Sequence, residues 1–225
     1  MNTTKYLRVK ICCISTIEEA RLAISLGASA IGLVSKMPSG PGPISEDLIT
    51  MIAASVPPGI ATFLLTSKRD AAGIVQQQRA TRTNTIQIVD DFPIDEYARL
   101  RSELPGVKLV QVVHVRGEGS IQKAKEVSKY VDAILLDSGN PDLPTKELGG
   151  TGRVHDWAIS KSIREELEIP IYLAGGLKSE NVTQAIETVG PFAVDVCSGV
   201  RTNGKLDEKK LADFFVAVGK AKIKS

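Results

Sequence analysis

Eight short apolar runs alternate with eight helix-like segments along the 225 residues, and this alternation predicts a parallel sheet with helical crossovers. The mean repeat is roughly 28 residues, close to the ~30 of a typical (β/α)8 barrel. An open doubly wound sheet would suit four or five such units better than eight. No linker or low-complexity segment divides the chain. The sequence therefore predicts a single TIM (β/α)8 barrel domain over residues 1–225.

The strands are predicted from runs rich in Val, Ile, Leu and Ala that end at polar or glycine residues. Such runs are nearly continuous in apolar residues because both faces of a barrel strand are buried. The eight predicted strands cover residues 8–14, 29–35, 61–66, 85–89, 108–113, 131–136, 170–174 and 192–197.

The helices are predicted from capping residues and apolar periodicity. Thr16 and Glu19 have the spacing of a capping box, and Gly27 suits the end of that helix. Ser179 is the expected cap of the seventh helix and Asp207 that of the eighth, whose apolar residues recur at i, i+3, i+4 and i+7. The predicted helices begin near residues 16, 45, 70, 95, 120, 156, 179 and 207.

The composition is that of an ordinary globular protein, with a formal net charge of +2 and 43% hydrophobic residues. This balance gives no field that would direct the protein to nucleic acid or to a membrane surface. No apolar run approaches the ~20 residues of a membrane span, and the first residues lack the apolar core of a signal peptide. We therefore expect a cytoplasmic protein, either a monomer or a homodimer, with a small-molecule partner.

The chain has three cysteines, Cys12, Cys13 and Cys197, and two histidines, His114 and His155. An odd number of cysteines without metal-ligand spacing favours a reducing compartment over a disulfide framework. No zinc constellation is present, so we expect neither a metal nor a cofactor. A contact between Cys12 and Cys197, across the first and last strands, is interpreted as packing rather than as a redox pair.

Strand alternation predicts which side chains face the barrel interior. In the first strand, Val9, Ile11 and Cys13 form an apolar set that should face the helices, which leaves Lys10 and Cys12 inside.

At the end of the sixth strand, Asp137 is expected in the barrel mouth, since a helix-facing position there rarely needs an acid. In the eighth strand, Asp195 and Cys197 should face inward. The eighth strand closes on the first, so Lys10 and Asp195 are predicted to form an interior ion pair, with a structural and a catalytic role equally open. Cys12 is either a small buried hydrophobe or a thiolate favoured by Lys10.

Glycines follow each of the last three strands, in a region where barrel phosphate sites often form. Glycine lets backbone N–H groups approach phosphate oxygens closely, and the amino ends of helices favour negative charge. One cluster alone would be weak evidence, because glycine is the default turn residue. Three at consecutive strand ends favour a phosphate ligand. The clusters are Gly149-Gly150-Thr151-Gly152, Gly175-Gly176 and Ser198-Gly199.

Five motifs, in this order and spread over residues 8–216, resemble the phosphoribosylanthranilate isomerase family of tryptophan biosynthesis. None is decisive alone, but the ordered set is specific. The motifs are Lys10-Ile-Cys12, Leu135-Leu-Asp-Ser138, Gly149-Gly-Thr-Gly152, Leu173-Ala-Gly-Gly-Leu177 with Glu180-Asn-Val182, and Asp195-Val-Cys-Ser-Gly-Val200.

The resemblance implies an Amadori rearrangement of an N-linked phosphoribosyl aminoaldose to a 1-deoxyribulose aminoketose, with no metal or redox cofactor. It implies that Cys12 is the general base and Asp137 the general acid. Lys10, Arg153 and Asp195 are further candidates for contact with the substrate. The resemblance also implies phosphate binding through the backbone of Gly150, Gly152, Gly175, Gly176, Ser198 and Gly199.

The sequence departs from the family pattern mainly at the anthranilate end of the site. Gly42 stands about where the family has the arginine that meets the anthranilate carboxylate, and the strand-four motif Gln87-Ile-Val-Asp lacks the usual histidine. Lys36 or Arg153 is the candidate replacement cation.

Near Cys12, this chain has Cys13 where the family has a glycine, and Cys197 lies in a strand-eight motif that is rich in serine in the family. Arg201 stands at a position where the family often has an acid. Two other functions stay open: a barrel isomerase or lyase acting on another phosphorylated sugar, and a non-catalytic phosphometabolite-binding barrel. The loop 139–148 has no assigned contact and is a candidate cover over the site.

Overall fold

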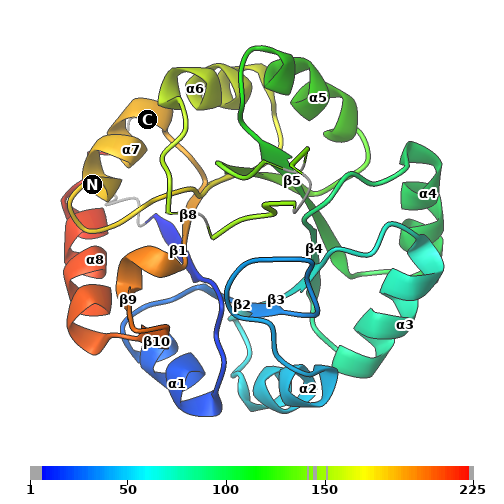
Figure 1. The fold of residues 1–225 in the computed structure, drawn as a ribbon, viewed down its shortest axis with the longest axis horizontal. Helices are drawn as coiled ribbons and strands as arrows, with labels where there is room; N and C mark the ends of the chain where they lie inside the picture. The colour runs from blue at the N-terminus through cyan, green and yellow to red at the C-terminus, as the bar shows by residue number, and fades with distance from the viewer. Residues whose placement is uncertain (1–6, 141, 144–145, 151, 223–225) are drawn as a thin grey trace, which may run out of the picture.

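The chain folds as a (β/α)8 barrel in which eight parallel strands close in the order β1 to β8, with β8 paired to β1. The computed structural model describes residues 7–140, 142–143, 146–150 and 152–222. Figure 1 looks along the barrel and shows the helices as a ring around the strands. The predicted fold is confirmed, and the predicted domain limits at residues 1 and 225 lie outside the described residues.

The strands match the predicted runs to within a few residues at each end, and the first shows the largest difference. It ends at Ile11 rather than at residue 14. The strands are β1 (Arg8–Ile11), β2 (Ala30–Val34), β3 (Ala61–Thr66), β4 (Thr85–Ile88), β5 (Lys108–His114), β6 (Ala133–Asp137), β7 (Ile171–Leu173) and β8 (Ala193–Val196).

The helices begin within three residues of the predicted positions. Thr16 caps the first, accepting a hydrogen bond from the N–H of Glu19, and Asp207 caps the last. The seventh helix was predicted wrongly at its start, because Asn181 rather than Ser179 is the cap residue. The helices are α1 (Ile17–Ser25), α2 (Glu46–Ser55), α3 (Ala71–Thr81), α4 (Ile94–Glu103), α5 (Gly119–Val127), α6 (Trp157–Glu166), α7 (Val182–Val189) and α8 (Glu208–Lys220).

A small hairpin between β8 and α8 was not predicted. It consists of β9 (Arg201–Thr202) and β10 (Lys205–Leu206), preceded by the 3-10 helix η1 (Ser198–Val200). Asn203 and Gly204 connect the two strands with φ angles of 51° and 77°. Asn-Gly is the preferred pair for a two-residue hairpin turn with positive φ, so the dipeptide was the available signal.

The buried core has two parts, as alternation along barrel strands requires. One lies between strands and helices and includes Val9 and Ile11; the other lies inside the barrel and includes Cys12. The prediction that Cys13 faces the helices was wrong, because Cys13 belongs to the inner part. Its φ is +62°, and a left-handed residue after the end of β1 does not continue the alternation.

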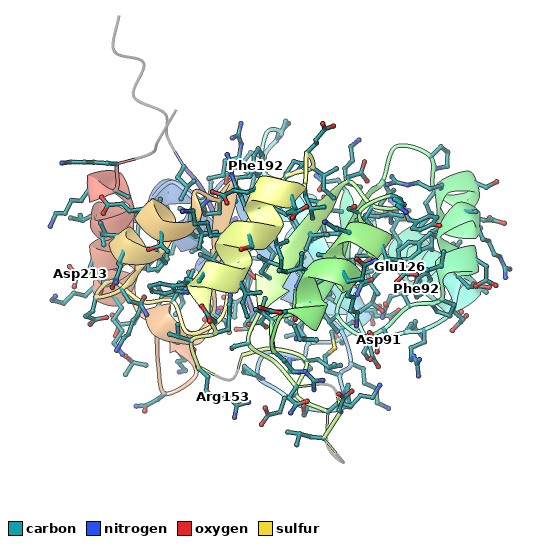
Figure 2. All side chains as sticks on the ribbon, turned by 90° about the horizontal axis from the view of Figure 1, so that it is seen from above. Asp91, Phe92, Glu126, Arg153, Phe192 and Asp213 are labelled. Atoms are coloured by element: carbon teal, nitrogen blue, oxygen red, sulfur yellow. The ribbon has the colours of Figure 1, made fainter. Side chains whose placement is uncertain are left out.

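Among the described residues, no helix is long and apolar enough to cross a bilayer. The two faces of the barrel differ in what they carry. Phe192 precedes β8 and lies at one edge in Figure 2, whereas Arg153, in the loop after β6, lies at the opposite edge. The second edge is therefore the carboxyl end of the strands, where active sites of this fold lie.

Candidate active site

The floor of the site is an ion pair between the first and last strands. Lys10 Nζ lies 2.9 Å from Asp195 Oδ1, and the two residues are in register on β1 and β8. Lys10 is fully buried, and burial alone would lower its pKa, but the Asp195 carboxylate outweighs it and the pKa of Lys10 lies above its ordinary value. Lys10 is therefore a cation, and the predicted interior pair is confirmed.

Gly32 on β2 makes room for this floor. A Cβ atom at Gly32 would lie 2.9 Å from Cys12 Sγ and 3.0 Å from Lys10 Nζ. A glycine on the neighbouring strand therefore lets both side chains occupy the barrel interior at the same height.

Cys12 follows β1 directly and lies at the cavity wall, 6% exposed. The adjacent Cys13 thiol lowers the pKa of Cys12, burial opposes the change, and the charge of Lys10 lowers the pKa further. The net direction is downward, which favours the thiolate. Thiolate rather than thiol is the form that accepts a proton, so the environment suits Cys12 as a base.

Arg201 fixes the backbone at Cys12 and Cys13. Its guanidinium donates to the carbonyl oxygens of Cys12 at 3.2 Å and Cys13 at 2.5 Å, and it forms an ion pair with Glu19 at 2.9 Å. Gly204 of the hairpin also accepts from Arg201, at 3.0 Å. The unpredicted hairpin thus supports the segment that carries the thiol.

Asp137 is the last residue of β6, buried at 7% exposure, and it lines the same cavity. Burial raises the pKa of Asp137 to about 6, although a hydrogen bond from the Ser138 N–H to Oδ1, at 2.7 Å, works in the opposite direction. Gly149 lies against the carboxyl group, since a Cβ there would be 2.8 Å from Oδ2. The acid is therefore enclosed, and it keeps its proton to a higher pH than an ordinary aspartic acid does.

Two loops meet over the mouth. Ser39, in the loop after β2, donates a hydrogen bond to the carbonyl of Lys146, in the loop after β6, and Pro41 packs where a side chain at Gly150 would lie. Lys146 also forms an ion pair with Asp90 at 2.6 Å, beyond the end of β4. The described part of the loop 139–148 therefore contacts the loop after β2 and the end of β4.

The cavity at the barrel mouth is partly open to solvent, and its empty volume, open solvent included, is about 700 Å³. Its wall contains Cys12, Asp137 and Asp195 together with residues of both loops. Of the predicted phosphate-binding residues, the wall contains Gly150, Gly152, Gly175, Gly176 and Ser198.

The glycines of the wall fit positions that a side chain would block. Gly175 and Gly176 have φ angles of 81° and 60°, and a Cβ at Gly176 would lie 2.6 Å from the Arg153 backbone. Gly199 does not line the cavity but packs against Leu177, whose carbonyl oxygen would be 2.0 Å from an added Cβ. These close approaches bring three backbone segments together at the ends of β6, β7 and β8.

Neither predicted replacement cation reaches the cavity wall. Arg153 forms an ion pair with Glu147, and its side chain is 57% exposed at the edge of the molecule in Figure 2. Lys36 is exposed and does not line the cavity. Among the described residues, the charged side chains of the wall are the two carboxyl groups of Asp137 and Asp195.

Sequence reasoning missed several residues of the wall. Met37, Ser39 and Pro41 come from the loop after β2, and Gln87 comes from β4. Alternation along β4, with Ile86 in the outer core, would have placed Gln87 inside. Within the described part of the chain, no group of three or more His, Cys, Asp or Glu could hold a metal ion.

A buried thiol and a buried carboxylic acid in one cavity at the mouth of a (β/α)8 barrel define an enzyme of acid–base chemistry. The family model described as N-(5'phosphoribosyl)anthranilate (PRA) isomerase matches residues 9–217. The chain belongs to this family.

The relatives and solved structures agree with that assignment. The chain is 38% identical over 210 residues to N-(5'-phosphoribosyl)anthranilate isomerase 2 of Methanosarcina mazei, covering 92% of each protein. It is 34% identical to the isomerase of Methanocella arvoryzae, covering 93% of this chain and 96% of the relative. The crystal structure of the Thermotoga maritima isomerase superimposes with a TM-score of 0.81 at 29% identity, covering 94% and 98% of the two chains.

Proposed function

We propose that this chain catalyses the Amadori rearrangement of N-(5-phosphoribosyl)anthranilate to 1-(2-carboxyphenylamino)-1-deoxyribulose 5-phosphate in tryptophan biosynthesis. Asp137 acts as the general acid and Cys12 as the general base. The observation that carries these roles is that a buried acid of raised pKa and a thiol of lowered pKa line one cavity in a member of this family.

The reaction needs two proton transfers. Protonated Asp137 gives its proton to the furanose ring oxygen; the bond from that oxygen to C1′ breaks, and the nitrogen lone pair forms the protonated Schiff base. The Cys12 thiolate then removes the proton from C2′, and the electron pair moves toward nitrogen to give the enolamine. The enolamine tautomerises to the ketone. Side chains of this chain supply both proton transfers.

The opposite pKa shifts of the two groups suit these steps. Burial favours the neutral form of Asp137, which is the form that donates, while the Cys13 thiol and Lys10 favour the thiolate of Cys12. Paired groups whose environments move their pKa values in opposite directions are typical of acid–base sites.

The glycine segments after β6, β7 and β8 are the proposed phosphate anchor, because their backbone lies at the cavity wall. Anchoring the phosphate would hold the ribose in register with the two proton-transfer groups and reduce the entropic cost of reaction. The solved family structure in complex with reduced 1-(o-carboxyphenylamino)-1-deoxyribulose 5-phosphate shows that a relative, 27% identical, takes such a molecule.

A second function is favoured by one observation, the lack of a cationic side chain in the described cavity wall. The substrate of the first proposal carries an aryl carboxylate, which a cation normally neutralises. A barrel isomerase acting on a phosphorylated sugar without that carboxylate would not need one.

The fluorescence of phosphoribosylanthranilate reports turnover, because rearrangement removes it. We expect the purified protein to abolish this fluorescence, and absence of turnover while the substrate is stable would contradict the proposal. Cys12→Ser and Asp137→Asn should each lower kcat by about 100-fold or more with the fold intact by circular dichroism. A non-catalytic binding barrel predicts that the wild-type protein and both variants bind substrate equally and turn over none.

We further propose cytoplasmic function, supported by an odd and small number of cysteines, which does not suit a disulfide framework. A solved relative from Thermotoga maritima, 26% identical, is described as a dimeric isomerase from which monomers were generated. For this chain we propose a monomer or homodimer, which size-exclusion chromatography with light scattering distinguishes.

A further inference from the structure

Two thiols that the proposed reaction does not require as acid or base face one another beside Cys12. Cys13 follows the end of β1 and Cys197 follows β8, and their Sγ atoms lie 2.6 Å apart. A disulfide has an S–S distance of ~2.05 Å.

Cys13 is held in a conformation that a side chain rarely adopts. Its φ of +62° lies in the left-handed region, which is unfavourable for a non-glycine residue. Backbone strain of this kind is concentrated at functional sites. A glycine would avoid this strain, so the Cys13 side chain is present at a cost in stability.

The surroundings accommodate the Cys13 side chain. A Cβ at Gly42 would lie 2.7 Å from Cys13 Cβ and 3.0 Å from its Sγ. Gly42 has no side chain, and the Cys13 thiol fills the space beside it.

A small reagent can reach the pair. Cys197 is half-buried, and both thiols line the active-site cavity and a second cavity of about 570 Å³ beside Arg201. Arg201 donates to the Cys13 carbonyl, which keeps a positive charge near the pair. The thiolate is the species that attacks a disulfide, and the neighbouring thiols together with burial raise the pKa of Cys13, so exchange at this pair becomes faster as pH rises.

We propose that Cys13 and Cys197 are a redox modification site that forms an intrachain disulfide by exchange with a small-molecule disulfide such as glutathione disulfide. The Cys197 thiolate attacks one sulfur of the reagent and releases one glutathione thiolate, giving a mixed disulfide. The Cys13 thiolate then attacks the Cys197 sulfur and releases the second. The two protein thiols together lose two electrons, and glutathione disulfide gains them to become two molecules of glutathione. The two protons of the protein thiols pass to the two glutathione thiolates.

The disulfide affects the neighbouring Cys12. The neighbouring Cys13 thiol is the largest influence that lowers the pKa of Cys12, and a disulfide sulfur has no proton with which to stabilise the Cys12 thiolate. Oxidation therefore raises the pKa of Cys12 and lowers the share of thiolate at neutral pH. This consequence rests on the proposed role of Cys12 as the base, whereas the disulfide itself does not.

The first test is chemical and needs no turnover. The native full-length protein is equilibrated with mixtures of reduced and oxidised glutathione, quenched in acid, denatured and alkylated. Before alkylation, we expect the oxidised wild type to have a mass 2 Da below that of the reduced chain. After alkylation, it should carry the label on one cysteine, and the peptide map should show Cys13 linked to Cys197. A wild type that keeps three alkylatable thiols at the most oxidising mixture overturns the proposal.

Three variants locate the bond. Cys13→Gly, which suits the positive φ, and Cys197→Ser should each abolish the intrachain link, while Cys12→Ser should leave it intact. A link that persists in Cys13→Gly joins Cys12 to Cys197 and overturns the assignment.

The second test uses phosphoribosylanthranilate turnover, with each protein compared with its own reduced form. We expect oxidation to lower kcat/KM of the wild type about tenfold, the size of one lost hydrogen bond to a charged group, with recovery in dithiothreitol. Oxidised Cys197→Ser should keep its own rate. If the disulfide forms without any loss of rate, the expected rise in the pKa of Cys12 is contradicted. If no reduced protein shows turnover, the proposed function is contradicted, while the mass measurement still tests the disulfide.

Discussion

Lys10 and Asp195 face each other at the same level of β1 and β8, where the barrel closes, with 2.9 Å between Nζ and Oδ1. The pair lies beneath the reactive cavity, and its charge also bears on Cys12. Two unit charges this deeply buried are stable only as partners, because each alone would carry a desolvation penalty of several kcal/mol.

A double-mutant cycle tests this dependence. Lys10→Met leaves a buried carboxylate, and Asp195→Asn leaves a buried ammonium, so each single change should lower the free energy of unfolding by about 3–5 kcal/mol. The double variant leaves no charge and should lose at least about 2 kcal/mol less than the sum of the two. Urea denaturation gives the values, and additive losses would show that the two charges do not interact.

The same pair was predictable from the sequence because it follows from strand alternation and barrel closure. Cys12 and Asp137 followed from alternation and position at strand ends. Cys13 did not, because its left-handed backbone breaks the alternation, and no propensity reveals a positive φ at cysteine. The contacts between the loops after β2 and β6 depend on tertiary packing, which local sequence does not encode.

Gly32 is expected to be a steric requirement of the site. Gly32→Ala places a Cβ 2.9 Å from Cys12 Sγ and 3.2 Å from Cys12 Cα, so the thiol or the strand must shift. We expect a loss of about 1–3 kcal/mol in stability and a fall in kcat, because a shift of about 1 Å at a reacting group can cost on the order of 100-fold.

The matched control for that change is Gly219→Ala in α8. A Cβ at Gly219 meets no atom within 4 Å, so alanine should stabilise the helix by about 0.5–1 kcal/mol and leave kcat unchanged. Thermal unfolding and fluorescence turnover measure the two variants. A Gly32→Ala protein that matches this control in both would show that the space beside Cys12 is not needed.

Asp137 should make the protein less stable as pH rises. Burial puts its folded pKa at about 6, above the ~3.9 of an unfolded aspartate, so the folded state binds the proton more tightly. The stability from this group is fully present below about pH 4 and is lost as pH rises through about 6. Asp137→Asn removes the loss and should be more stable than the wild type at pH 8 by about 1–3 kcal/mol.

Urea denaturation at pH 5 and pH 8 measures this difference, which should shrink toward the lower pH. Asp213→Asn on the surface of α8 is the control, because its carboxylate pairs with Lys209 in solvent. It should gain nothing at pH 8, since exposed pairs contribute ~0–1 kcal/mol. An Asp137→Asn protein that is less stable than the wild type at pH 8 would mean that the native state prefers the ionised acid.

The Gln87 side chain is expected to lower the stability of the fold and to strengthen substrate binding. Among the described residues its Oε1 is buried without a hydrogen-bond partner, and it lines the cavity from β4, which lies across the closed barrel from β8. The amide therefore comes from the strand opposite the one that precedes Ser198 and Gly199. Gln87→Met should raise KM about tenfold and raise the free energy of unfolding by about 1 kcal/mol, because it removes an unsatisfied acceptor.

Gln111→Met provides the contrast. Gln111 is equally buried, but its amide is satisfied: Oε1 accepts from Tyr97 at 2.6 Å and Nε2 donates to the Asp90 carbonyl at 2.9 Å. Methionine at position 111 should lower the free energy of unfolding by about 1–3 kcal/mol, because it leaves both partners without their hydrogen bonds. Steady-state kinetics and urea denaturation separate the effects. If Gln87→Met loses stability as Gln111→Met does, the Gln87 amide has a structural partner rather than a role toward substrate.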